Sequence, residues 1–169
     1  SAASDVYKRQ GEAWCHCVAW WVPTWDGWGE RTEDQNRALR EELFERGEYD
    51  GTLLYADGVP VAWCQHGPRD RWTKLRRQFD LEPDPQAWAL SCFLVHEDYR
   101  RRGIARRLLQ GVLAALDAEG VRRVEAFPKR GDDLDAGELW NGPESLLLEN
   151  GFELLHPDPA RPVLVRLRG

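Results

Sequence analysis

The sequence predicts an α/β fold built around a strand, a helix and a second strand in succession. Residues 88–95 form an apolar run, too short for a helix, between Pro85 and acidic residues, which indicates a buried strand. Residues 121–127 form a second short apolar run. Between them, four apolar residues recur at near-helical spacing and predict one buried helix face: Ile104, Leu108, Val112 and Leu116. A strand, a helical crossover and a strand make a βαβ unit with parallel strands.

The elements before this unit follow from capping and breaker signals. Residues 12–22 are rich in Trp, Val and Cys and predict a strand that Pro23 stops. Thr32 and Gln35 fit a capping box at the start of a helix, because the two side chains can satisfy each other's free amides. The expected inward residues of this helix are Leu39, Leu43 and Phe44, and Gly47 is its expected stop.

A hairpin and a short helix are expected next. Residues 52–56 and 59–65 flank Asp57-Gly58, a strong signal for a two-residue turn between antiparallel strands. Residues 69–79 predict a short basic helix. After the βαβ unit, residues 129–139 predict a polar loop, and Pro143 suits the first position of another helix. Residues 152–155 and 163–167 predict two closing strands.

Composition limits the classes of function. A chain of 169 residues with 42% apolar residues and nine tryptophans is sufficient for one folded domain, expected over residues 11–169. Residues 1–10 resemble a translated sequencing adaptor and are expected to be a non-native tail. The net charge of −6 argues against a nucleic-acid partner. No apolar run approaches the roughly 20 residues of a membrane span, and four cysteines without a disulfide-like framework favour a cytoplasmic location.

Gly103 lies where the central helix is expected to begin, among five arginines: Arg100, Arg101, Arg102, Arg106 and Arg107. Amides in a first helical turn have no intrahelical partner, so they attract anions. A residue without a Cβ also lets a phosphate approach the backbone closely. The alternative is an ordinary turn with a solvated basic face.

The spacing Arg100-x-x-Gly103-x-Ala105 after a strand resembles the Q/R-x-x-G-x-G/A signature of the GNAT superfamily of acyl-CoA-dependent N-acyltransferases. Residues 147–152, Leu-Leu-Glu-Asn-Gly-Phe, look like a later motif of that family at the expected separation. The Cys-x-Cys pair and residues 125–128 further resemble a bacterial subgroup. The resemblance implies a mixed, mostly antiparallel sheet with a central splayed parallel βαβ unit and helices on both faces.

The resemblance also implies a coenzyme site. Acetyl-CoA would be the co-substrate, and its pyrophosphate would lie against the turn formed by Arg100, Arg101, Arg102, Gly103, Ile104, Ala105 and Arg106. The pantetheine would follow the central strand, where Phe93 and Val95 offer backbone groups. An amide near Phe93 or Leu94 would stabilise the oxyanion of the tetrahedral intermediate. The implied reaction is transfer of the acetyl group to a primary amine, by a monomer or homodimer.

The proton-transfer groups depart from the family pattern. The central strand carries no carboxylate, so Glu125 on the next strand is the predicted base, with a structural pair to Arg123 or Lys129 as the alternative. His66 and His96 are weaker candidates. Leu147 stands where the family commonly has a tyrosine that protonates the thiolate, so the expected acid is Ser145 or ordered water, with unassisted departure of the thiolate as the alternative. These departures keep a second function open, a non-catalytic acyl-CoA-binding regulatory domain.

Two further groups of residues admit alternatives. Cys15 and Cys17 on one strand would share a face, near Cys64 and Cys92, and could bind a metal. Zinc sites usually take ligands from turns, however, so core packing is favoured and no metal is expected. Among the tryptophans, Trp25 and Trp28 lie in a glycine-rich loop and are the best candidates for an aromatic wall that holds a cationic amine.

Overall fold

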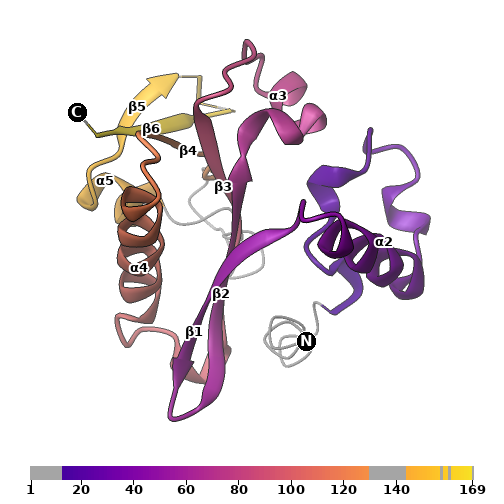
Figure 1. Cartoon of the computed structure of the whole chain (residues 1–169), viewed down its shortest axis with the longest axis horizontal. Helices are drawn as coiled ribbons and strands as arrows, with labels where there is room; N and C mark the ends of the chain where they lie inside the picture. Colours follow the sequence, from indigo (N-terminus) through magenta and orange to yellow (C-terminus); the bar gives the residue numbers. More distant parts are fainter. Residues whose placement is uncertain (1–12, 130–143, 157, 160, 169) are drawn as a thin grey trace.

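The apolar run at the centre of the sequence forms the interior strand β3 (Ala87–Val95) of a six-stranded sheet (Figure 1). A computed structural model describes residues 13–129, 144–156, 158, 159 and 161–168. The strand order is β1-β2-β3-β4-β6-β5, and only β3 and β4 run parallel. The other strands are β1 (Asp50–Ala56), β2 (Val59–Pro68), β4 (Arg123–Ala126), β5 (Glu153–His156) and β6 (Val163–Leu167). The mixed, mostly antiparallel sheet is therefore confirmed.

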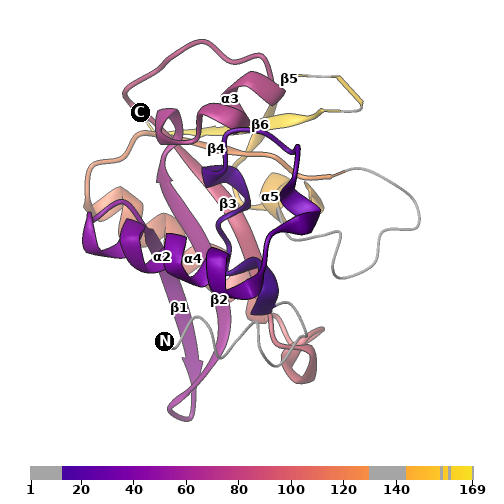
Figure 2. The same cartoon turned by 90° about the vertical axis from the view of Figure 1, so that its right-hand side faces the viewer.

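Helices cover both faces of this sheet. Helix α4 (Ile104–Ala118) joins β3 to β4 and packs on one face, together with α5 (Glu144–Glu149). Helices α2 (Glu33–Glu45) and α3 (Thr73–Gln78) lie on the opposite face, with the N-terminal segment, residues 14–31. Figure 2 shows α2 and this segment in front of the sheet and α4 behind it. None of the described helices is long and apolar enough to cross a membrane.

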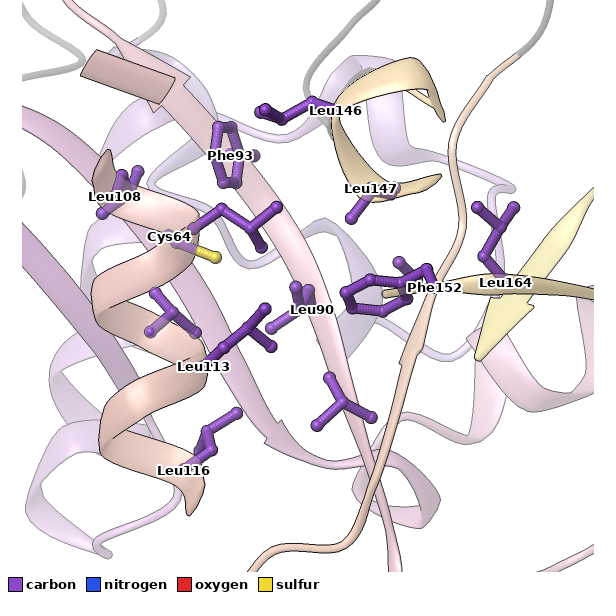
Figure 3. Close-up of a cluster of buried hydrophobic side chains, with 14 of the residues drawn as sticks. Cys64, Leu90, Phe93, Leu108, Leu113, Leu116, Leu146, Leu147, Phe152 and Leu164 are labelled. Atoms are coloured by element: carbon purple, nitrogen blue, oxygen red, sulfur yellow. The ribbon is translucent and has the colours of Figure 1, made fainter. Parts of the chain in front are cut away.

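The largest core fills the space between the sheet and α4. Leu108, Val112 and Leu116 are buried there and Ile104 packs against them, so the predicted helix face is confirmed. Figure 3 shows Leu108 and Leu116 of α4 beside Leu90 and Phe93 of β3, with Phe152 and Leu164 to the right of Leu90, on the side away from α4. The βαβ unit is thus held by apolar burial on its α4 side.

The central parallel pair opens along its length. Register pairs run from Ala87↔Arg123 to Leu90↔Ala126, and β3 then continues to Val95 without β4 beside it. Figure 3 shows the two ribbons diverging beyond Leu90. The splay implied by the family resemblance is present, and β4 does not pair with the second half of β3.

Local signals located several elements correctly. Asp57 and Gly58 form the turn between β1 and β2 with φ of 50° and 78°, as a two-residue hairpin requires. Thr32 Oγ1 accepts from the amide of Gln35, and Gln35 Oε1 accepts from the amide of Thr32, so the capping box is complete. The final strand spans Val163–Leu167 as predicted.

The strand predicted for residues 12–22 is wrong, because the described part of this stretch contains two 3₁₀ turns, η1 (Ala13–Cys15) and η2 (Ala19–Trp21). His16 and Cys17 between them have φ of 48° and 53°, which a strand cannot contain. Residues 17–20 are all buried, so the stretch is enclosed on several sides instead of alternating between two faces. Burial inside the fold overrode the strand propensity of Trp, Val and Cys.

Two helical details also differ from prediction. Phe44 is 70% exposed and lies outside the core, whereas Leu43 is buried. The helix predicted for residues 69–79 is divided into η4 (Arg69–Arg71) and α3, because Trp72 between them has non-helical φ and ψ of −98° and 80°. Short turns η3 (Trp28–Glu30) and η5 (Glu97–Tyr99) complete the elements. Most of the predicted polar loop at 129–139, and Pro143, lie outside the described residues.

Candidate functional site

A β-bulge lies where the central strands separate. The β2–β3 register passes from Cys64↔Phe93 to His66↔Leu90, so Gln65 faces two residues of β3, Ser91 and Cys92. Ser91 Oγ donates to Gln65 Oε1 at 2.8 Å, and both side chains are buried. A bulge turns the backbone locally and re-aims the groups next to it. The bulge and the end of β4 pairing therefore coincide in the middle of β3.

The turn after β3 presents free backbone donors to solvent. Gly103 has φ of 72°, in the left-handed region that glycine adopts readily, and nothing lies within 4 Å of where its Cβ would be. The amide of Arg107 donates to the carbonyl of Gly103 at 3.1 Å, so the amides before residue 107 precede the first helical hydrogen bond. An open helix N-terminus with an unobstructed approach is suited to an anion.

Arginines fix and charge this turn. Arg100 Nε donates to the carbonyl of Val95 at 3.0 Å, which ties the turn to the end of β3. Arg101 and Arg102 are exposed, and the Arg102 guanidinium lies 5.8 Å from the ring centre of Tyr99. Arg106 is paired with Glu149 of α5. Arg101 and Arg102 thus place positive charge at the exposed edge of the turn, whereas Arg100 holds the turn against the end of β3.

Glu125 is fully buried and held by two guanidinium groups. Arg69 Nη1 donates to its two carboxylate oxygens at 2.9 and 2.8 Å, and Arg123 donates from Nε and Nη2 to Oε1 at 3.1 and 2.9 Å. Arg69 also donates to Asp70 Oδ1 and to the carbonyl of Glu82. Glu125 lies opposite Ala89, one residue before the parallel pairing ends. These contacts favour the structural pair with Arg123 and add Arg69, which the sequence analysis did not connect with it.

A family model described as the acetyltransferase (GNAT) family matches residues 14–140. The chain belongs to this family. An acetyltransferase from Thermus thermophilus is similar in structure, with 21% identity, a TM-score of 0.56, and coverage of 82% of this chain and 76% of that chain. At this identity the likeness shows the fold. No curated protein matches the chain.

Two similar structures of GNAT proteins contain the coenzyme. A PaiA N-acetyltransferase from Thermoplasma acidophilum in complex with coenzyme A has 12% identity and a TM-score of 0.51, with coverage of 98% of this chain and 94% of that chain. The YhbS protein from Escherichia coli in complex with CoA has 19% identity and a TM-score of 0.52, with coverage of 81% and 68%. The GNAT fold of this chain is thus one that holds coenzyme A in other proteins.

The residues predicted around the acid position lie on α5 of this GNAT domain. Leu147 is buried in the main core with Leu146 and Phe152, so the position of the usual tyrosine has become a packing position (Figure 3). Ser145 is exposed in the first turn of α5. Its hydroxyl is in contact with solvent, and its role as the acid stays a prediction.

The two candidate histidines have structural contacts. His66 Nε2 lies 2.9 Å from Thr52 Oγ1, and burial lowers the pKa of His66. His96 is buried at the end of β3, where its Nδ1 accepts from the amide of Asp98. Both side chains help to hold strand ends, and a role for either as the base stays a prediction.

The aromatic wall already contains a cation from the chain itself. Lys74 of α3 places its Nζ over Trp25, with Trp20 and Trp28 alongside. The sequence analysis singled out Trp25 and Trp28 for a cationic amine but missed Lys74, because no spacing rule connects a lysine to tryptophans some fifty residues earlier.

All four cysteines are free thiols close to the central strand. Burial raises the pKa of Cys15 to about 12 and holds the pKa values of Cys64 and Cys92 well above their usual range, so these thiols stay protonated. Cys17 is hydrogen-bonded to Cys92. Cys92 lies in the bulged part of β3, and Cys64 is the last residue of β2 in register before the bulge. Among the residues with a described position, no group of His, Cys, Asp and Glu is arranged to hold a metal ion.

Proposed function

We propose that this GNAT domain transfers the acetyl group of acetyl-CoA to a primary amine. The observation that carries the proposal is continuity between the splayed half of β3 and the open turn at Gly103. An extended chain with a polyanionic end matches that geometry, since the tail would lie along β3 beyond its pairing with β4 and the phosphates against helix amides. The CoA complexes of similar structures support this choice of ligand.

The proposed binding roles follow the path of such a ligand. Amides of Gly103, Ile104 and Ala105 would hold the pyrophosphate, with charge supplied by Arg101, Arg102 and Arg106 and the turn positioned by Arg100. Backbone groups of Phe93 and Val95 would bind the pantetheine. An amide near Phe93 or Leu94, next to the bulge, would donate to the oxyanion. The bulge supports this last role, because it re-aims backbone donors at the point where the strands part.

The reaction requires two proton transfers. The neutral amine nitrogen attacks the thioester carbonyl, and a tetrahedral oxyanion forms. The C–S bond then breaks to release CoA thiolate, the nitrogen loses its extra proton, and the thiolate takes up one, which leaves a neutral amide and CoA thiol. Ser145 or water would supply that proton, and Glu125 is the predicted base for the amine. The contacts of Glu125 oppose a direct role, because Arg69 and Arg123 occupy its carboxylate oxygens. An alkyl amine with a pKa of about 10.4 would then lose its proton to water or to another group.

Thiol release from acetyl-CoA in the presence of a panel of primary amines tests the proposal directly. A second test uses Gly103→Glu, which places a bulky carboxylate where the pyrophosphate would lie. Gly111→Glu is the matched control, because Gly111 is on the exposed side of the same helix with nothing within 4 Å of its Cβ position. Calorimetry should show loss of acetyl-CoA binding for Gly103→Glu alone. Equal affinity in the two folded variants would exclude this coenzyme site.

A non-catalytic acyl-CoA-binding domain is the second candidate function. Two observations favour it: Leu147 is a core residue where GNAT enzymes commonly carry tyrosine, and Glu125 is paired with two arginines. A domain of this kind would bind acetyl-CoA through the same turn without turnover. Coenzyme binding without thiol release, over the full amine panel, would select this function.

A further inference from the structure

An ammonium group lies inside a cage of three tryptophans, Trp20, Trp25 and Trp28. Lys74 Nζ is 3.4 Å from the ring centre of Trp25 and 5.7 Å from those of Trp20 and Trp28. It also donates to the carbonyl of Ala19, and the Lys74 residue is only 4% exposed. Ring faces and one carbonyl oxygen thus surround a cation, the arrangement by which proteins recognise alkylammonium ligands.

The ammonium is held without an opposite charge. In the part of the chain that the structure describes, Lys74 forms no ion pair with a carboxylate, although buried lysines are normally paired. Burial lowers the pKa of Lys74 to about 8, so the group still carries its proton at neutral pH. An ion held in this way is easier to displace than one locked to a buried carboxylate.

The cage adjoins the point where the central strands separate. Trp20 packs in one cluster with Ala89 of β3 and with Phe127, the first residue after β4. Ala89 is opposite Glu125, one step before the last parallel pair. The cage therefore lies on the sheet face opposite α4 and next to the splay, where an acceptor would have to approach a thioester placed between the strands.

The outer wall of the cage is open to solvent. Trp25 is 41% exposed, and its indole Nε1 donates to Gln78 Oε1 at 2.7 Å, which fixes the ring over the ammonium. Part of the ring that lies closest to Lys74 Nζ is thus in contact with solvent. The net charge of −6 favours the approach of cations over anions.

We propose that the cage of Trp20, Trp25 and Trp28 binds the alkylammonium group of the acceptor, and that Lys74 occupies it as an intramolecular stand-in. This inference rests on the proposed acetyltransferase function. The stand-in has an unbranched four-carbon stem, so the ligand class is an aliphatic primary amine of similar shape, such as a diamine or a lysine side chain. A tethered occupant competes at high effective concentration, so its removal raises the affinity for an external amine.

The test uses Lys74→Ala titrated with n-butylammonium chloride and followed by the indole N–H signals in NMR spectra. We expect saturable binding with shifts at Trp20, Trp25 and Trp28, at least about tenfold tighter than in the wild-type protein. Adding Trp25→Ala should weaken that binding by about tenfold, the size of one desolvated cation–π contact. Arg77→Ala is the matched control, because Arg77 Nη2 donates to the carbonyl of Pro23 and links the same helix to the same segment outside the cage.

Three outcomes would overturn the proposal. One is a folded Lys74→Ala protein without saturable binding, and another is binding that Trp25→Ala leaves unchanged. If Lys74→Ala does not fold alone, thermal melts measure whether added n-butylammonium restores its folding. Restored folding supports the cage as an ammonium site, because a ligand that binds the native state stabilises it. Failure to restore folding is the third overturning outcome, and it makes Lys74 a structural link.

Thiol-release kinetics separate this inference from the proposed function. With acetyl-CoA and n-butylamine, the KM for the amine should fall by about tenfold in Lys74→Ala, while kcat changes little. Amine binding in the cage without thiol release from any acceptor would reject the acetyltransferase function and leave an ammonium site. If thiol is released but the KM for the amine is the same in Lys74→Ala and Trp25→Ala as in the wild-type protein, the acetyltransferase function is retained and the cage is rejected as its acceptor site.

Discussion

At the scale of a single residue, Glu125 has two competing interpretations, a catalytic base and a structural partner of arginines. A carboxylate on an interior strand beside the splay was a reasonable candidate base, and the structure surrounds it with Arg69 and Arg123. Glu125→Gln removes the negative charge and leaves the buried guanidinium group of Arg69 and the half-buried one of Arg123 in place. Breaking a buried pair from one side commonly costs about 3–5 kcal/mol, so we expect a loss of that order in urea unfolding. Asp34→Asn, which breaks an exposed pair with Arg37, should change the unfolding free energy by under about 0.5 kcal/mol.

Turnover of the same variant distinguishes the two roles of Glu125. Loss of a general base typically lowers the rate by ~10²–10⁴, and the deficit should shrink as the pH approaches the pKa of the amine. A structural carboxylate predicts a deficit that does not recover with pH, because its cause is a displaced strand. The contacts of Glu125 lead us to expect the second result. Recovery of kcat/KM between pH 7 and 10 in a stable Glu125→Gln protein would restore the catalytic assignment.

Lys74 makes a second prediction at the residue scale, in the pH dependence of stability. Burial lowers its pKa to about 8 in the folded protein, against about 10.4 in an unfolded chain. Between these values the unfolded state binds more protons, so stability gains from this residue as the pH rises through that window. Lys74→Met removes the titrating group. The stability of the wild-type protein relative to Lys74→Met should therefore increase from pH 8 to 10.5 in urea titrations, and a decrease would contradict the lowered pKa.

At the scale of elements, the start of helix α4 offers a site where the energetic cost of a left-handed backbone can be measured without a steric clash. Gly103 needs φ of 72°, yet an added Cβ would meet no atom within 4 Å. Gly103→Ala should therefore cost about 1–2 kcal/mol from the left-handed conformation alone. Because a methyl group adds no charge, acetyl-CoA affinity should fall far less than in Gly103→Glu. Calorimetry and urea unfolding on the two variants measure the two effects separately, and equal losses of affinity would mean that the turn itself has rearranged.

Elements with strong local sequence signals were predictable, and segments whose conformation depends on contacts with distant parts of the chain were not. The Asp57-Gly58 turn and the Thr32 capping box satisfy their hydrogen bonds within a few residues, so neighbouring sequence is sufficient. The stretch that includes His16 and Cys17 depends on distant partners instead. Tyr49 donates through its hydroxyl to the carbonyl of His16, and Asn36 donates to that of Trp14. Such contacts join residues that are far apart in the chain, so no local sequence pattern predicts them.

The candidate site divides along the same line. The turn at Gly103 is continuous in sequence, so its arginines and its glycine could be recognised before the structure was known. The Lys74 cage joins α3 to the N-terminal segment, and Glu125 meets Arg69 from another element. These pairings depend on how η4 and α3 are placed over the sheet. The proposed coenzyme site was therefore predictable from the sequence, whereas the proposed acceptor site required the fold.

At the scale of the whole molecule, the cysteines report on both faces of the sheet. Cys64 lies in the core beside α4, while Cys17 and Cys92 lie in the core beneath α2. Burial keeps the pKa of Cys92 high, and thiolate is the species that reacts with alkylating agents. Labelling of these thiols therefore requires the sheet to open.

We expect Cys17, Cys64 and Cys92 to react with iodoacetamide at pH 7.5 only as fast as the protein unfolds globally. Their protection factors should then agree with one another and with the unfolding free energy from urea, because one sheet joins the two cores. Mass spectrometry of timed labelling mixtures gives the three rates, and protein unfolded in urea supplies the unprotected reference. Faster labelling of Cys17 and Cys92 than of Cys64 would mean that the N-terminal segment and α2 open separately from the α4 face. The acceptor side would then be a subglobal unfolding unit, and the sheet with α4 would remain as the stable base for the coenzyme.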